Sequence, residues 1–339
     1  MARNLFIWIT LFVLLLAGCK QAPADAVPAP DHPFTILYSG FGQSESQQQS
    51  IRTFLLEACD LDPVFITCSD ATQALAALRQ DSLQVDVWIG LDNVIAPLIE
   101  VDSLFADVHT PQRSGLGTDR SFFAPRKIAA YGYSYFAILY DSQDVQEPPR
   151  TCGELQDGAW HESLLLPDAR ISSLGNGMVQ WSNELFGDNG YQQFWRSIKP
   201  NVYHITPGWR EAFDMLLADE APLAIGLVSQ PWGYHLKDDV ARYKAVLPQE
   251  GSWLFLEGVA ILKKSTYKAE AQKVVNLLFT EEYQSLVTTQ GWLFPVDTHI
   301  EMISGIHGLK PTGERRIKSS EIAAHNTYWI LRWKKIVLK

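Results

Sequence analysis

The sequence predicts an α/β protein with two domains, each built on a mostly parallel sheet flanked by helices. Two observations predict this fold class: segments typical of strands and helices alternate along the chain, and 339 residues suffice for two domains of ordinary size. The composition is globular, since 47% of the residues are hydrophobic and 19% are charged. A formal net charge of −10 argues against nucleic acid as a partner, because binding phosphates over a broad surface requires clustered lysine and arginine.

The N-terminal half of the folded part shows βαβ alternation, which indicates a parallel sheet. The predicted elements are, in order, a strand at 34–38, a helix with Ile51, Phe54, Leu55 and Ala58 on its apolar side, a strand at 64–67, a helix with Ala71, Ala74, Leu75 and Leu78 on its apolar side, and a buried strand at 85–89.

The C-terminal half continues the alternation with longer extended segments. The predicted elements are an aromatic-rich extended run at 131–140, a short strand at 164–166, a helix at 175–185, an amphipathic helix at 209–217, a strand at 223–227, a strand at 254–262, and a helix marked by Ala271, Val274, Val275 and Leu278.

The N-terminus has the pattern of a bacterial lipoprotein signal peptide over residues 1–18. Arg3 precedes an apolar run at 5–16, and small residues lead directly to Cys19. Cleavage before Cys19 would leave a diacylated cysteine, with fatty chains such as palmitate as the only membrane anchor. Residues 19–33, rich in Ala and Pro, then form a flexible tether, and the folded part lies in the periplasm or outside the cell. The alternative is an uncleaved anchor.

Three cysteines remain after Cys19. In an oxidising compartment Cys59 and Cys68 are a candidate disulfide pair, which would leave Cys152 as a thiol. The alternative is three buried thiols, because spacing in the sequence does not determine the Cα separation that a disulfide requires.

Motifs of known catalytic or metal chemistry are missing from the sequence. It contains no HExxH, paired CxxC, GxSxG or P-loop pattern, so neither a catalytic residue nor a metal site is predicted. Several tryptophans instead stand beside Gly or Pro, as in Gly208-Trp209, Pro231-Trp232 and Gly291-Trp292, where loops are expected. These aromatic side chains either line a binding cleft or close the edges of the domains.

Five segments resemble the thiamine-binding substrate-binding proteins of ABC transporters, within the class of periplasmic binding proteins. They are 86–93 (DVWIGLDN), 131–141 (YGYSYFAILYD), 206–213 (TPGWREAF), 291–296 (GWLFPV) and 328–333 (YWILRW).

This resemblance implies the two-lobed periplasmic-binding-protein fold, with two crossing strands as the hinge. Lobe 1 would comprise 34–128 and 259–339, and lobe 2 would comprise 129–258. A monomer would hold a small ligand between the lobes and deliver it to an ABC permease, without a cofactor and without catalysis.

The resemblance also suggests the ligand-binding residues. They are Asp70 and Ala71 after a strand, Asp168, Ser172 and Ser173 in a polar loop, and the aromatic residues Trp209, Tyr234 and Trp292. Asp70, Ser172 and Ser173 could equally serve as helix caps, Asp70 with Gln73 three residues later. Residues 38–43 (YSGFGQ) depart from the family pattern, so part of the aromatic wall in lobe 1 is missing.

The resemblance implies thiamine or a thiamine phosphate as the ligand, and aromatic faces and a carboxylate suit its planar cation. The first alternative is an iron(III)-binding lipoprotein on the same fold, although Tyr234 lacks the adjacent second tyrosine that iron would favour. The second is a thiamine-processing enzyme with Cys152 as its nucleophile, for which the sequence indicates no activating partner.

Overall fold

The computed structural model describes residues 32–41, 44–80, 83–111, 126–238, 242–300, 309 and 311–339. The predicted signal peptide, the lipidation site Cys19 and most of the tether lie outside these ranges. Within them, no helix combines the length and apolar character that crossing a bilayer requires.

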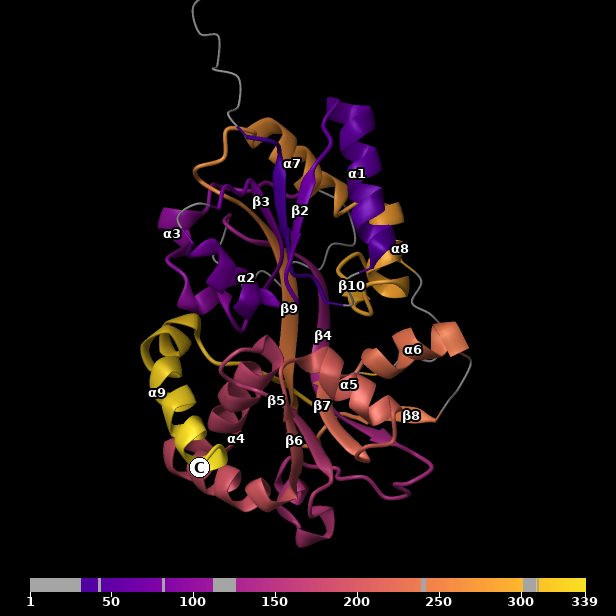
Figure 1. The fold of residues 1–339 in the computed structure, drawn as a ribbon, viewed down its shortest axis with the longest axis vertical. Coiled ribbons are helices and arrows are strands. Elements are labelled where there is room, and N and C mark those ends of the chain that lie inside the picture. Colours follow the sequence, from indigo (N-terminus) through magenta and orange to yellow (C-terminus); the bar gives the residue numbers. More distant parts are fainter. Residues whose placement is uncertain are drawn as a thin grey trace, which may run out of the picture. The chain divides into compact units, whose positions relative to one another are not determined.

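A central sheet with the strand order β2-β1-β3-β9-β4-β7-β5-β6 organises the fold (Figure 1). The strands are β1 (Thr35–Tyr38), β2 (Val64–Thr67), β3 (Val87–Asp92), β4 (Ala129–Asp141), β5 (Leu164–Pro167), β6 (Val202–Thr206), β7 (Leu223–Leu227), β8 (Tyr243–Val246), β9 (Ser252–Ile261), β10 (Phe294–Pro295) and β11 (Glu314–Arg315). The mixed α/β architecture predicted from the sequence is confirmed.

The sheet contains two parallel groups joined by two long antiparallel strands. β1 pairs in parallel with both β2 and β3, and β5 pairs in parallel with both β6 and β7. Between the groups, β9 pairs antiparallel with β3 and β4, and β4 pairs antiparallel with β7. Both long strands therefore connect the two groups, and β9 is buried along its whole length because helices and neighbouring strands cover it.

Helices alternate with the strands and cover the sheet (Figure 1). The α-helices are α1 (Glu45–Cys59), α2 (Ala71–Leu78), α3 (Val101–Leu104), α4 (Ser173–Ile198), α5 (Trp209–Leu217), α6 (Gln230–Asp238), α7 (Lys268–Leu277), α8 (Glu281–Thr289) and α9 (Ser319–Val337). Short 3-10 helices are η1 (Ala96–Leu98), η3 (Gly153–Gln156), η4 (Gly158–Trp160) and η5 (Lys199–Asn201).

The helix predicted at 175–185 is longer in the structure and continues to Ile198. Gly187 interrupts it with a φ of +66°, a conformation that glycine adopts without the steric cost of a side chain. The prediction stopped near this break, whereas the chain resumes the helix and buries Phe194 and Trp195 on its far side.

The C-terminal helix α9 runs beside α4 in the same direction (Figure 1). Gln180 of α4 donates a hydrogen bond to Asn326, and the rings of Trp195 and Trp333 meet edge to face at 6.0 Å. α9 also contacts η1. The predicted lobe 1 includes α9 and the predicted lobe 2 includes α4, so this contact would link the two, and the division into lobes remains a prediction.

Cys59 and Cys68 are thiols in the structure and form no disulfide. Cys59 ends α1, and β2 then carries the chain away from that end for about 13 Å before Cys68. A disulfide needs Cα atoms within about 7 Å, so the direction of β2 opposes this pairing. Of the two alternatives left open by the sequence, a disulfide or three thiols, the structure contains three thiols. Cys152 is buried, and the other two are partly buried.

Candidate functional site

A small cavity lies where the carboxyl ends of β1, β2 and β3 face the first turns of α4 and α5. The cavity measures about 10 Å³, roughly the room that one water molecule needs. Its lining consists of Ser39, Phe41, Ser69, Asp70, Asp92, Ser173, Leu174, Trp209, Phe255 and Glu257. Carboxyl ends of parallel strands are where open α/β sheets hold their ligands, which makes this cavity the candidate binding site.

Asp70 ties two helix N-termini together at the cavity. One carboxylate oxygen accepts hydrogen bonds from the backbone N–H groups of Thr72 and Gln73 at 2.9 and 3.2 Å, which caps α2. The other oxygen accepts the N–H of Ser173 at 2.9 Å, at the start of α4. Burial raises the pKa of Asp70, and these backbone donors offset part of that rise. The cap role and the place at the cavity are therefore both present in the structure.

Two further buried carboxyl groups line the cavity, those of Asp92 and Glu257. Burial raises the pKa of Asp92 to about 7 and that of Glu257 to about 8. Glu257 accepts hydrogen bonds from the Tyr131 hydroxyl and, at 2.6 Å, from the Phe41 N–H. The described residues of the lining include no Lys, Arg or His, so the charge that would best stabilise the ionised forms is that of a cationic ligand.

Two aromatic rings in the cavity lining come from different strand groups and stack on each other. Phe41, which follows β1, stacks on Trp209, the first residue of α5, with ring centroids 4.1 Å apart and planes at 27°. Trp292 meets Trp209 edge to face at 6.2 Å and also contacts Phe213 at 6.3 Å. Tyr234 lies behind Phe213 at 6.0 Å. The result is a continuous aromatic cluster that leads away from the cavity.

Glycine at position 233 allows this arrangement. A Cβ atom on Gly233 would lie 2.2 Å from the indole carbons of Trp292, far closer than atoms can approach. Trp292 therefore packs directly on the backbone of α6. Trp292 itself has a φ of +54°, which is uncommon for a non-glycine residue and fixes the direction of its indole.

The structure brings some of the predicted site residues together and leaves others aside. Asp70, Ser173 and Trp209 line the cavity, and Trp292 contacts Trp209 without lining it. Tyr234 is separated from the cavity by Phe213, and Ala71 is fully buried in the first turn of α2. The ligand-binding roles of all these residues remain predictions.

The polar loop before α4 is held by its own contacts. Asp168 accepts hydrogen bonds from the Arg170 guanidinium at 2.5 to 3.1 Å, so these two side chains neutralise each other outside the cavity lining. Ser172 is fully buried, and its hydroxyl makes no hydrogen bond of ordinary geometry with the described residues, although it lowers the pKa of nearby Asp70. Ser69 does line the cavity, and its buried hydroxyl oxygen likewise makes no hydrogen bond with the described residues.

Phe41, Asp92 and Glu257 line the cavity, although they are not among the ligand-binding residues predicted from the sequence. Phe41 belongs to the segment 38–43 in which an aromatic wall was judged to be missing, and it is the ring that faces Trp209. The position of Phe41 directly after the first predicted strand is the sequence feature that could have indicated a place at the cavity. For Glu257 the signal was a charged residue within the apolar run of a predicted buried strand, and for Asp92 it was the end of such a strand.

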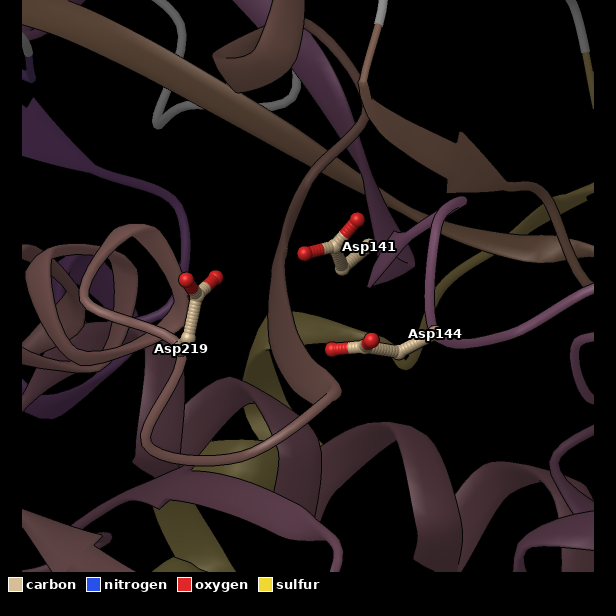
Figure 2. Close-up of side chains that lie close together, drawn as sticks. All are labelled: Asp141, Asp144 and Asp219. Atoms are coloured by element: carbon tan, nitrogen blue, oxygen red, sulfur yellow. The ribbon is translucent and has the colours of Figure 1, made fainter.

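A group of three carboxylates outside the cavity has the spacing of a possible metal site. Ligand atoms of Asp141, Asp144 and Asp219 lie within 4.8 Å of one another (Figure 2). Arg242, however, forms ion pairs with both Asp141 and Asp219, so its guanidinium already supplies the positive charge. The carboxylates of the cavity do not form such a group among the described residues.

Comparisons with known proteins agree with this geometry. The chain is 25% identical over 314 residues to the thiamine-binding periplasmic protein of Brucella abortus biovar 1 (strain 9-941), an alignment covering 91% of this chain and 93% of the relative. A solved structure of a periplasmic thiamin-binding protein superposes with a TM-score of 0.81 at 24% identity, covering 92% of this chain and 99% of that one. Iron-bound HitA from Pseudomonas aeruginosa shares the fold, with a TM-score of 0.74 at 14% identity, over 90% of this chain and 99% of that one.

The family model described as bacterial extracellular solute-binding protein matches residues 106–306. The match includes β4, the whole β5–β7 group, and β9. Because it spans more than half of the 339 residues, the protein belongs to the family of bacterial extracellular solute-binding proteins.

Proposed function

We propose that the protein is an extracytoplasmic solute-binding lipoprotein that captures thiamine or a thiamine phosphate and delivers it to an ABC permease. The observation that carries the proposal is the cavity itself, where stacked aromatic rings and three buried carboxyl groups meet and the part of the lining that the structure describes holds no cationic side chain. The names of the relatives point to the same ligand.

The chemistry of thiamine suits these walls. Its thiazolium ring is a permanent cation on a planar frame, so an aromatic face offers both burial and cation–π attraction, about 0.5–2 kcal/mol for each ring. The carboxylates of Asp92 and Glu257 supply negative charge at the same place. A ligand with these properties compensates the cost of ionising buried carboxyl groups.

Ligand entry requires the walls to separate, since about 10 Å³ is far less than a thiamine molecule occupies. Phe41 follows β1 and Trp209 follows β6, so moving the two strand groups apart would separate the stacked rings. β4 and β9 link the two groups, so bending of these strands would part the rings and closure would press them on the ligand. This is the movement of two lobes that the fold predicts.

The geometry favours thiamine over iron(III) and over an enzymatic role. The cavity carboxylates do not converge on one point as an oxygen-coordinated ion requires. Cys152 is 1% exposed, and burial raises the pKa of its thiol well above the usual range, so it is a poor nucleophile. We therefore propose binding without catalysis, by a monomer, with no cofactor.

Isothermal titration of the purified protein with thiamine, thiamine monophosphate, thiamine diphosphate and iron(III) tests the proposal. We expect saturable binding of at least one thiamine form, together with quenching of tryptophan fluorescence. Trp209→Ala should weaken that binding, whereas Trp160→Ala, on η4 away from the cavity, should not. Binding of iron(III) alone, or release of free pyrimidine or thiazole during incubation with thiamine, would reject the proposal in favour of the corresponding alternative.

A further inference from the structure

A basic pocket lies where α4 and α9 end side by side. It has a volume of about 430 Å³ and is lined by Gln192, Arg196, Lys199, Arg332, Lys335, Ile336 and Lys339. Five of these seven residues are cationic and none is acidic, in a chain whose net charge is −10. The pocket is therefore a local concentration of positive charge on a protein whose overall charge is negative.

The parallel course of the two helices explains how the cations come together. Contacts from Gln180–Asn326 through Trp195–Trp333 keep α4 and α9 in register, so that both end at the same place (Figure 1). Lys199, just beyond α4, donates a hydrogen bond to the carbonyl oxygen of Ile336 in α9 at 3.1 Å. Packing of α4 against α9 therefore fixes the positions of the residues that line the pocket.

Stabilisation of helix ends accounts for only part of this charge. A helix C-terminus carries about half a negative charge, so two of them amount to about one, against five cationic side chains. The ion pairs that the described residues form with lysine or arginine lie elsewhere in the molecule. None of these ion pairs among the described residues involves the five cations of the pocket, so a surplus of positive charge remains there.

We propose that this pocket binds a phosphate-bearing polyanion. Its volume is in the range of small-molecule sites, and lysine and arginine from two helices converge as the oxygens of linked phosphates require. The candidate thiamine cavity is lined by carboxyl groups, so the two sites have opposite charge.

Phosphate chemistry of this kind has two sources, a soluble polyphosphate or the headgroup of an anionic lipid. Exposed apolar side chains on α9 beside the pocket help to distinguish these two sources. Tyr328 and Leu331 are 45% and 60% exposed there, and the Arg332 guanidinium lies 5.1 Å from the Tyr328 ring centroid. Apolar side chains beside cations are what a lipid interface engages, whereas a soluble anion needs the cations alone.

The test compares two double variants that each remove two positive charges, with excess thiamine present to occupy the other site. Arg196→Gln/Lys335→Gln removes two cations that line the pocket. The matched control, Lys334→Gln/Lys244→Gln, changes the exposed neighbour of Lys335 on α9 and an exposed lysine on β8, neither of which lines the pocket. Each protein is titrated with inorganic pyrophosphate and with vesicles containing phosphatidylglycerol.

We expect binding in at least one of these titrations, weakened about tenfold or more in the pocket variant and less than about twofold in the control. Pyrophosphate binding identifies a soluble anion, and vesicle binding that Leu331→Ser weakens identifies a lipid headgroup. Equal weakening in both double variants, or no binding of either probe by the unaltered protein, would overturn the proposal. Thiamine affinity should be the same in all variants, which separates this result from the proposed function.

Discussion

The ring of Phe41 lies flat against the indole of Trp209, with centroids 4.1 Å apart. The two residues are far apart in the sequence, and one follows a strand of the β1–β3 group while the other begins α5. A stacked aromatic pair contributes about 0.5–1.5 kcal/mol beyond the burial of its surface. The pair therefore connects the two strand groups at the cavity, where we expect a planar ligand to insert.

Replacement of Phe41 tests this relationship. In the Phe41→Ala variant a bound thiamine loses one of its two ring contacts, so we expect affinity to fall by about 0.5–1.5 kcal/mol, roughly two- to twelvefold. Isothermal titration measures the effect, and Phe65→Ala, which removes a ring from β2 outside the cavity lining, serves as the control. Unchanged or tighter binding would mean that Phe41 only fills the unliganded cavity.

A second prediction concerns pH. Burial raises the pKa of Asp92 to about 7 and of Glu257 to about 8, and a bound cation should lower both, because it stabilises the carboxylates. Thiamine should therefore bind more tightly as pH rises from about 6 to about 9, and binding should release protons. Calorimetry in buffers of different ionisation enthalpy counts those protons.

The same groups affect the stability of the unliganded protein in the opposite direction. Both carboxyl groups bind protons more strongly in the folded state than in the unfolded state, so their contribution is fully present below about pH 4 and is lost as pH rises through 7 to 8. Glu257→Gln should flatten this loss in thermal melts between pH 6 and 9. Glu282→Gln, at an exposed site on α8, should leave the profile unchanged.

The sequence predicted the first three strands and the two helices between them, because strand-like segments alternate there with amphipathic helical segments. It could not place Glu257, since the burial of that side chain depends on Phe41 and Tyr131, which lie more than 100 residues away. The Cys59–Cys68 pair illustrates the same limit: two residues close in sequence are separated by the direction of β2. Local patterns determine elements, whereas contacts between distant segments determine the site.

A third prediction concerns Gly233 and the position of Trp292. In Gly233→Ala the added Cβ would collide with the Trp292 indole, so the indole must shift from its place beside Trp209. We expect a loss of stability of about 1–3 kcal/mol, as for overpacking, together with weaker thiamine binding. Gly158→Ala is the control, since a Cβ there meets no atom within 4 Å. Chemical denaturation and titration should both show the difference, and equal behaviour of the two variants would contradict the packing described.

The lipid anchor can be tested through Cys19. If residues 1–18 are a signal peptide and Cys19 is acylated, Cys19→Ala should move the protein from the membrane fraction to the soluble fraction. Fractionation followed by immunoblotting detects the change, and mass spectrometry of the N-terminal peptide identifies the acyl chains. Cys152→Ala is the control, because that thiol is buried in the folded part. A Cys19→Ala protein that stays in the membrane fraction would rule out acylation as the anchor.

The last prediction separates the contacts made to the thiamine rings from those made to phosphate. Trp209 lines the cavity with its ring, a feature that thiamine, its monophosphate and its diphosphate would meet in the same way. Trp209→Ala should therefore weaken binding of all three by similar factors.

Ser172 should behave differently because its buried hydroxyl is available as a donor and lies beside Asp70. A hydrogen bond to a charged phosphate is worth about 1–3 kcal/mol, so Ser172→Ala should weaken binding of the phosphorylated forms by that amount and leave thiamine nearly unaffected. Ser285→Ala, at a half-buried site on α8 outside the cavity lining, controls for the loss of a hydroxyl. If titrations show that Ser172→Ala weakens all three forms alike, Ser172 supports the fold of the loop and does not contact phosphate. That outcome would leave the Ser69 hydroxyl, which lines the cavity, as the next donor to test.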